Sequence, residues 1–208
     1  MLSFLDLPGE IRNQIYLELL IVPDLATPLL QFGSHPIYPR ILEVCQKVHD
    51  EAKEILYGIN TFLAHPNLLT GLPRLRLHYD TISSESIISL IRRYHIRVRL
   101  DCDPNFTAIK VIDAFTDIEE LSIEVFQTQY GGSDYNVLRL FEGIRGVKKA
   151  NIFGSTSSFP KYAEWLQDAM MTPKGIVLKS FNDGSKEDVR LKAPELSVQA
   201  YKMFGQLT

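Results

Sequence analysis

Cysteine is scarce in this chain, which has only Cys45 and Cys102 among its 208 residues. The two lie far apart in the sequence, and each falls on the apolar face of a predicted element. We therefore expect two buried free thiols in a reducing compartment and no disulfide. The compartment predicted on this basis is the cytoplasm or the nucleus.

Long apolar runs are also missing. No segment approaches the roughly 18 consecutive apolar residues that a membrane-spanning helix needs. The first ten residues, MLSFLDLPGE, lack the basic start and apolar stretch of a secretory signal. We expect no membrane association, and we interpret the sequon at Asn105 as chance, because glycosylation requires secretion.

The chain has no large excess of charge of either sign. Its formal net charge is −3 at pH 7, so no overall field favours nucleic acid or an anionic membrane. One basic cluster could meet phosphates, but acidic residues nearby dilute it, and nucleic acid is not the expected partner. The cluster comprises Arg74, Arg76, Arg92, Arg93, His95, Arg97 and Arg99.

Motifs of common catalytic sites are absent. The sequence contains no HExxH, CxxC, GxGxxG, P-loop or GxSxG pattern. Its five histidines show no metal-ligand spacing with cysteine or carboxylate. We therefore predict a protein that is not an enzyme and that uses no metal and no cofactor.

What is present is a pair of helical segments in the first 62 residues. The first reads LDLPGEIRNQIYLELL, with Asp6 as expected N-cap, Pro8 in the first turn, and an apolar stripe of Ile11, Ile15 and Leu19. The second reads ILEVCQKVHDEAKEILYGINTF. We expect it to begin near Pro39 and to end at Tyr57, with Gly58 as C-terminal cap.

These residues resemble the F-box-like domain found in proteins of filamentous fungi. The resemblance covers the pattern LPxEIRxxIYxxLL followed by ILxVCxxxxxEAxxxLYxxNTF, about the first third of the chain. It implies that the Leu-Pro turn and the next helix dock on the small adaptor of cullin-based SCF ubiquitin ligases. The positions that match the docking element are Leu7, Pro8, Ile11 and Ile15. The alternative is that the Ile11/Ile15/Leu19 stripe packs inside the fold against the second helix and the repeats that follow it.

After residue 62 the pattern changes to helix–strand units. Strands are expected around 75–79, 98–102, 121–125 and 150–153, and helices over 83–94, 107–115, 135–144 and 159–171. Leu100, Ile123 and Ile152 would occupy equivalent strand positions, 23 and 29 residues apart, near the period of leucine-rich repeats. The tail predicts a strand at 176–181, a partner strand at 189–191 and a helix from Pro194 to Phe204.

The predicted fold class is therefore α/β. An F-box-like helical pair (1–62) would precede an irregular leucine-rich-repeat-like layer (63–208) with mostly parallel strands, the two forming one continuous unit. Strand residues that alternate with the core would make a partner-binding strip, unless the tail covers it. That strip is Arg97, Arg99, Asp101, Glu124, Phe126 and Phe153.

The function predicted is a protein–protein interaction module, and specifically an F-box-type substrate receptor of an SCF ubiquitin ligase. The alternative is a stand-alone scaffold that binds protein or RNA through its strand face, without ligase docking.

Overall fold

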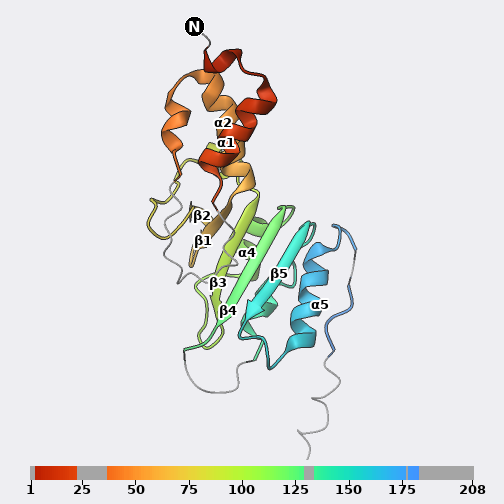
Figure 1. Ribbon diagram of the computed structural model, residues 1–208. Helices are drawn as coiled ribbons and strands as arrows, with labels where there is room; N and C mark the ends of the chain where they lie inside the picture. The colour runs from red at the N-terminus through yellow and green to blue at the C-terminus, as the bar shows by residue number, and fades with distance from the viewer. Residues whose placement is uncertain (1–2, 23–36, 129–133, 177, 183–208) are drawn as a thin grey trace, which may run out of the picture. The chain divides into compact units, whose positions relative to one another are not determined.

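The computed structural model describes residues 3–22, 37–128, 134–176 and 178–182 (Figure 1). The chain divides into two compact units, Met1–Leu178 and Lys179–Thr208, and the architecture below is that of the first. The partner strand expected at 189–191 and the helix expected from Pro194 to Phe204 lie outside the described residues.

The first unit begins with two helical segments, each of which is a 3-10 turn followed by an α-helix. A 3-10 turn, η1 (Phe4–Asp6), precedes α1 (Gly9–Leu20), and a second, η2 (Pro39–Glu43), precedes α2 (Gln46–Ile59). Asp6 does not cap α1 as predicted, because its carboxylate accepts the Ser3 N–H at 2.8 Å and so closes η1. Gly58 does not end α2 either; it lies inside the helix, which continues to Ile59.

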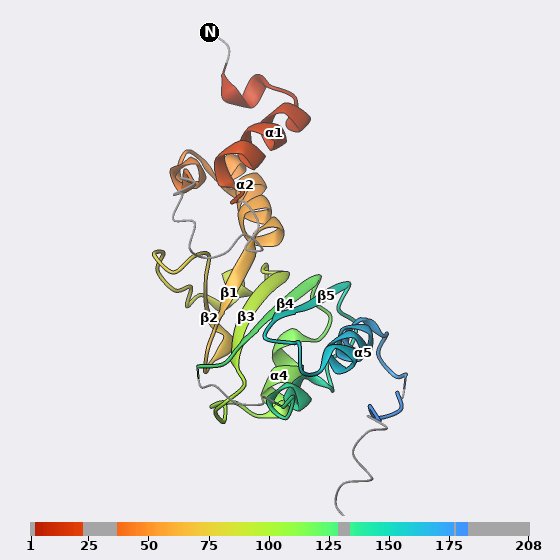
Figure 2. The ribbon, with the colours of Figure 1, turned by 60° about the horizontal axis from the view of Figure 1, so that its bottom comes forward.

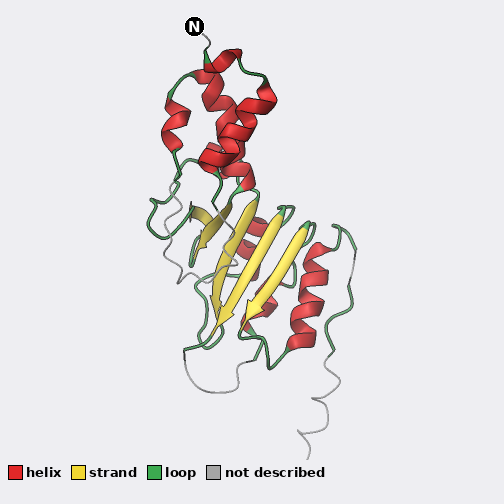
Figure 3. Ribbon diagram, viewed as in Figure 1, coloured by secondary structure: helices red, strands yellow, loops and turns green. Residues whose placement is uncertain are grey.

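A five-stranded sheet forms the body of the unit, in the order β2-β1-β3-β4-β5 (Figure 3). Strands β1, β3, β4 and β5 run parallel, and β2 pairs antiparallel to β1 at one edge. The predicted α/β class and mostly parallel sheet are confirmed. The bounds are β1 Thr61–His65, β2 Leu69–Arg74, β3 Arg93–Arg99, β4 Glu120–Phe126 and β5 Lys149–Gly154.

The register corrects one predicted equivalence. Ile123 pairs with Ile96 on one side and Ile152 on the other, so Ile96 and not Leu100 occupies the equivalent position in β3. Leu100 follows the end of β3. The alternation of apolar and polar residues nevertheless predicts the buried face of these strands correctly, because Ile96, Ile123 and Ile152 are all buried.

The helices that follow the strands cover one face of the sheet; Figure 2 shows α4 and α5 on the same side of it. The covering elements are α4 (Ala108–Phe115), η3 (Val137–Phe141) and α5 (Pro160–Met171), whereas the single turn α3 (Glu85–Ile88) buries no residue. The core between the layers holds the fully buried Phe115, Phe141, Tyr162 and Leu166. The helix expected over 107–115 is α4, which buries Val111 and Phe115 and leaves Ile109 72% exposed.

Several predicted element bounds are also wrong. Residues 75–79 form no strand, because the strand beside β1 is made by 69–74. The helix expected over 83–94 is the single turn α3, since Arg93 and Tyr94 already pair with both β1 and β4. The helix expected over 135–144 is the short 3-10 turn η3. Residues 178–182 are not in a strand.

Candidate functional site

The first helix presents its apolar stripe outward. α1 buries Arg12, Tyr16 and Leu20, one residue displaced from the predicted stripe. The four predicted docking residues form the face that we call the α1 outer face: Pro8 is exposed, Ile11 is 41% exposed, and Leu7 and Ile15 are half-buried. Leu19 of the same stripe is also half-buried, so the stripe packs in part against the rest of the fold, and both alternatives left open by the sequence stay predictions.

A group of hydrogen-bonded charged residues, here called the clamp, explains which side of α1 faces α2. The Arg12 guanidinium donates two hydrogen bonds to the Glu51 carboxylate of α2, from Nε at 2.9 Å and from Nη2 at 2.6 Å. The Tyr16 hydroxyl donates to the same carboxylate at 2.9 Å. These donors, Arg12 above all, lower the pKa of Glu51 to about 2. Bidentate pairing of this kind fixes the rotation of α1 about its axis as well as its distance from α2.

The same arginine also holds the Leu-Pro turn. Nη1 of Arg12 donates to the Leu7 carbonyl at 2.5 Å and lies 3.5 Å from the Leu5 carbonyl. Those carbonyls belong to the chain just before α1, so Arg12 links the turn, α1 and α2. Sequence reasoning assigned no role to Arg12, although Arg12 and Glu51 both stand in the quoted pattern.

A buried asparagine closes the other end of the helical pair. Asn60 is 2% exposed and follows α2 directly. Its Nδ2 donates to the Leu20 carbonyl at 2.8 Å and to the Leu56 carbonyl at 2.9 Å, and its Oδ1 accepts the Val22 N–H at 2.8 Å. Asn60 thus satisfies main-chain groups that the ends of both helices leave without helical partners.

The six residues predicted as a partner-binding strip come together on the sheet face away from the covering helices; we call them the strand-face strip. Arg97 of β3, Glu124 of β4 and Phe153 of β5 occupy one row across three strands. The Arg97 guanidinium lies 3.2 Å from the Glu124 carboxylate and 4.8 Å from the centre of the Phe126 ring. Phe126 and Phe153 are half-buried.

The charges in this strip are largely paired. Arg99 donates to both carboxylate oxygens of Asp101, at 2.8 and 3.0 Å, and these bonds, together with those from Thr128, lower the pKa of Asp101. Beside Arg97, the buried His95 lies 3.2 Å from Glu124; burial lowers its pKa, and Glu124 opposes that effect. A surface whose arginines already face carboxylates is a poor phosphate-binding surface.

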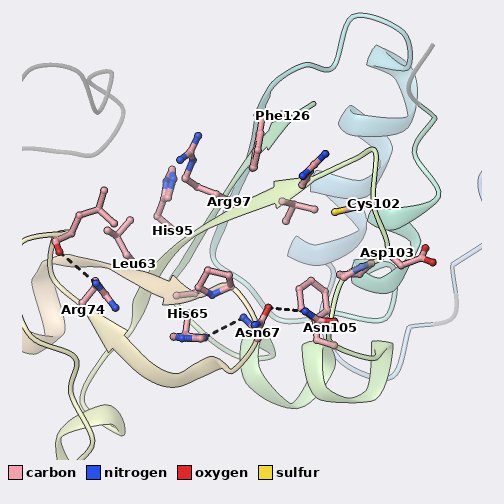
Figure 4. A pocket seen from close by; sticks show the side chains of 17 residues that line it. Leu63, His65, Asn67, Arg74, His95, Arg97, Cys102, Asp103, Asn105 and Phe126 are labelled. Atoms are coloured by element: carbon pink, nitrogen blue, oxygen red, sulfur yellow. Dashed lines mark hydrogen bonds between the residues drawn. The ribbon is translucent and has the colours of Figure 1, made fainter. Parts of the chain in front are cut away.

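A pocket of about 540 Å³ opens at one end of this strip (Figure 4). The β1–β2 hairpin forms one wall and the 102–106 loop the other, with β3 between them. Cys102 lines the pocket, and its free thiol is exposed, so the prediction of a buried thiol is wrong. Cys102 lies in the loop after β3, where side chains no longer alternate between the two faces of a strand. Cys45 is likewise half-buried, not buried. Sequence reasoning missed the pocket, because only the folded hairpin and loop bring its walls together.

Two common features are absent from the part of the chain that the structure describes. Among residues 3–22, 37–128, 134–176 and 178–182, no helix is long and apolar enough to cross a membrane. In that part of the chain no three histidine, cysteine or acidic side chains gather as a metal-binding group. Comparisons of the chain with family models, with curated proteins and with solved structures found no match.

Proposed function

We propose that this chain is a non-enzymatic, F-box-like interaction module whose α1 outer face docks the adaptor of an SCF ubiquitin ligase. The observation that carries the proposal is the outward position of Pro8 and Ile11 on a helix whose inner face is filled by Arg12, Tyr16 and Leu20. A helix that needed this stripe for its own packing would not leave Ile11 41% exposed.

The clamp supports the proposal in a second way. Arg12 holds the Leu7 carbonyl and Glu51 together, so the turn that precedes α1 is ordered before any partner arrives. A preorganised apolar surface binds more tightly than one that must be ordered on contact, since less conformational entropy is lost. In this proposal α2 is the support for the docking face and not part of it.

The sheet would then act as the receptor part. Each of β3, β4 and β5 is followed or preceded by a covering helix, and we interpret these units as an irregular leucine-rich-repeat-like layer. Its strand-face strip, with Arg97 48% exposed, would contact the protein to be captured. The same exposed strip is what favours the second candidate, a scaffold that binds a protein through the sheet without docking an adaptor.

Binding of the purified SCF adaptor to the full chain tests the proposal. We expect wild type to bind, and Ile11→Asp to weaken binding at least about tenfold, because an apolar anchor at an interface typically contributes about 2 kcal/mol or more. Leu17→Asp is the matched control: Leu17 is 39% exposed on the same helix but lies off the α1 outer face.

Circular dichroism on each variant ensures that a loss of binding is not a loss of folding. Equal binding by wild type and Ile11→Asp, or an equal loss in Leu17→Asp, would contradict docking through the α1 outer face. Absence of adaptor binding by folded wild type would leave the scaffold function as the better explanation.

A further inference from the structure

We propose that the pocket between the β1–β2 hairpin and the 102–106 loop, here called the hairpin pocket, receives an acidic residue and its apolar neighbour from an extended segment of a partner protein. The inference rests on the proposed interaction function and adds the chemistry of what the sheet recognises. It does not depend on adaptor docking, which involves a different surface.

Hydrogen bonds within and between its walls hold the hairpin pocket in shape. Nδ1 of His65 accepts the N–H groups of Asn67 and Leu68, at 3.2 and 3.1 Å, and so closes the hairpin turn. Across the mouth, Nδ2 of Asn105 lies 3.4 Å from Oδ1 of Asn67, linking the two walls (Figure 4). Because Nδ1 of His65 accepts these N–H groups, Nε2 is the ring nitrogen that is left to donate a hydrogen bond.

Within the part of the chain that the structure describes, one positive charge in the pocket has no carboxylate paired with it. Of the three arginines that line it, Arg97 faces Glu124 and Arg99 faces Asp101. Arg74 is half-buried in β2, and among the described residues its guanidinium makes a single long hydrogen bond, 3.4 Å, to the Leu77 carbonyl. A guanidinium can donate five hydrogen bonds, and a carboxylate is its best-matched acceptor.

The other charged groups around the pocket do not cancel Arg74. Among the described lining residues Asp103 is the one carboxylate, and it is exposed on the loop wall, whereas Arg74 is on the hairpin wall (Figure 4). Solvent screens an exposed carboxylate more strongly than a half-buried arginine. The buried His95 is held by Glu124. The field that an incoming acidic group meets at the hairpin wall is therefore that of Arg74.

The rest of the lining is mainly apolar. Leu63, Val98 and Phe106 are buried residues of its lining, and Phe126, also in the lining, is half-buried. A volume of about 540 Å³ suits a ligand with an apolar body and few polar groups, and exceeds what one carboxylate needs. An acidic side chain with a leucine or aromatic neighbour meets both requirements.

Continuity with the strand-face strip favours a peptide over a free small molecule. Arg97 and Phe126 belong to both surfaces. From them the row Arg97, Glu124 and Phe153 crosses two further strands, about 10 Å at the usual strand spacing. An extended chain can fill the pocket with two side chains and continue along this row, which a compact molecule cannot do.

Fluorescence polarisation and amide NMR with the full chain test the proposal. The probe is a fluorescein-labelled peptide with the sequence Ser-Gly-Phe-Asp-Leu-Gly-Ser, and the matched probe replaces its aspartate by asparagine. We expect the aspartate peptide to bind about tenfold or more tightly, and less tightly at high salt, because a charge-assisted hydrogen bond is lost in the asparagine peptide. Amide shifts should concentrate at Asn67, Arg74 and Asn105.

Variants at Arg74 separate charge from structure. Arg74→Gln should weaken the aspartate peptide about tenfold and leave the asparagine peptide unchanged, while Arg74→Lys should retain part of the preference. Arg92→Gln is the control, because Arg92 is exposed and does not line the pocket. Thermal melts of each variant confirm that the fold persists.

Three results would overturn the proposal. They are equal binding of both peptides, an unchanged affinity in Arg74→Gln, and shifts in the pocket with 3-phenylpropionate but with neither peptide. The last result would assign the pocket to small carboxylates instead. Ile11→Asp should bind the peptide like wild type, so failure of adaptor docking and failure of the pocket are distinguishable.

Discussion

Replacement of Asn60 by alanine tests how the helical pair is held. Asn60 makes three hydrogen bonds to the main chain of Leu20, Val22 and Leu56, which would lose their partner. Alanine keeps the Cβ of Asn60 and removes only its polar amide group. The energetic cost is therefore that of leaving two carbonyls and one N–H without a partner.

The magnitude follows from that count. Each hydrogen bond contributes about 1 kcal/mol, and an unsatisfied buried group costs about 1–3 kcal/mol. Val22 is half-buried, so water can reach part of the site and reduce the cost. We expect Asn60→Ala to lower the free energy of unfolding by about 2–3 kcal/mol, and the melting temperature by about 5–10 °C for a unit of this size.

Asn60→Asp should be worse than Asn60→Ala at neutral pH. A carboxylate can still accept the Val22 N–H, but it faces the Leu20 and Leu56 carbonyls without a hydrogen to donate. Its destabilisation should lessen at acid pH relative to wild type, because the protonated form regains a donor.

Urea unfolding followed by circular dichroism measures these differences. Asn151→Ala is the matched control, since Asn151 is exposed on β5 and its side chain has no hydrogen bond within the described residues. A loss below about 0.5 kcal/mol in Asn60→Ala, or an Asn60→Asp variant more stable than Asn60→Ala at pH 7, would refute the reasoning.

Two further predictions concern the same helices. Glu51 has a folded-state pKa of about 2 against an ordinary 4.5, so its contribution to stability is present above pH 4.5 and is lost as pH falls toward 2. The urea midpoint of wild type should therefore fall over this pH range by more than the midpoint of Glu51→Gln. An equal fall in both proteins would contradict a stabilising Arg12–Glu51 pair. Gly58→Ala should raise the free energy of unfolding by about 0.5–1 kcal/mol, because Gly58 lies inside α2 and an added Cβ meets nothing within 4 Å. A variant that melts at a lower temperature than wild type would disprove this.

Periodicity predicted the sheet well and its ends poorly. The alternation of Leu121, Ile123 and Val125 predicted β4 and its buried face without knowledge of the neighbouring strands. This is possible because successive side chains in a strand point to opposite faces of the sheet. Where β3 begins depends instead on pairing: Arg93 lies in the strand because β1 and β4 offer it hydrogen-bond partners on both sides.

The rotation of α1 could not be read from apolar periodicity. Ile11, Ile15 and Leu19 make the more obvious stripe, yet the helix buries Arg12, Tyr16 and Leu20. The deciding partner is Glu51, which lies 39 residues away and becomes a neighbour only when α2 packs alongside. The quoted pattern contains both residues, so the signal was present, but pairing them requires the tertiary contact.

By itself, the sequence determined the α/β class, the helical pair at the start, the parallel strands and the faces that they bury, because these depend on local spacing of apolar side chains. Tertiary structure decided which face of α1 is left outside and where the hairpin pocket lies. Both depend on side chains distant in sequence, Arg12 with Glu51 and Asn67 with Asn105, whose meeting is a property of the fold and not of any one segment.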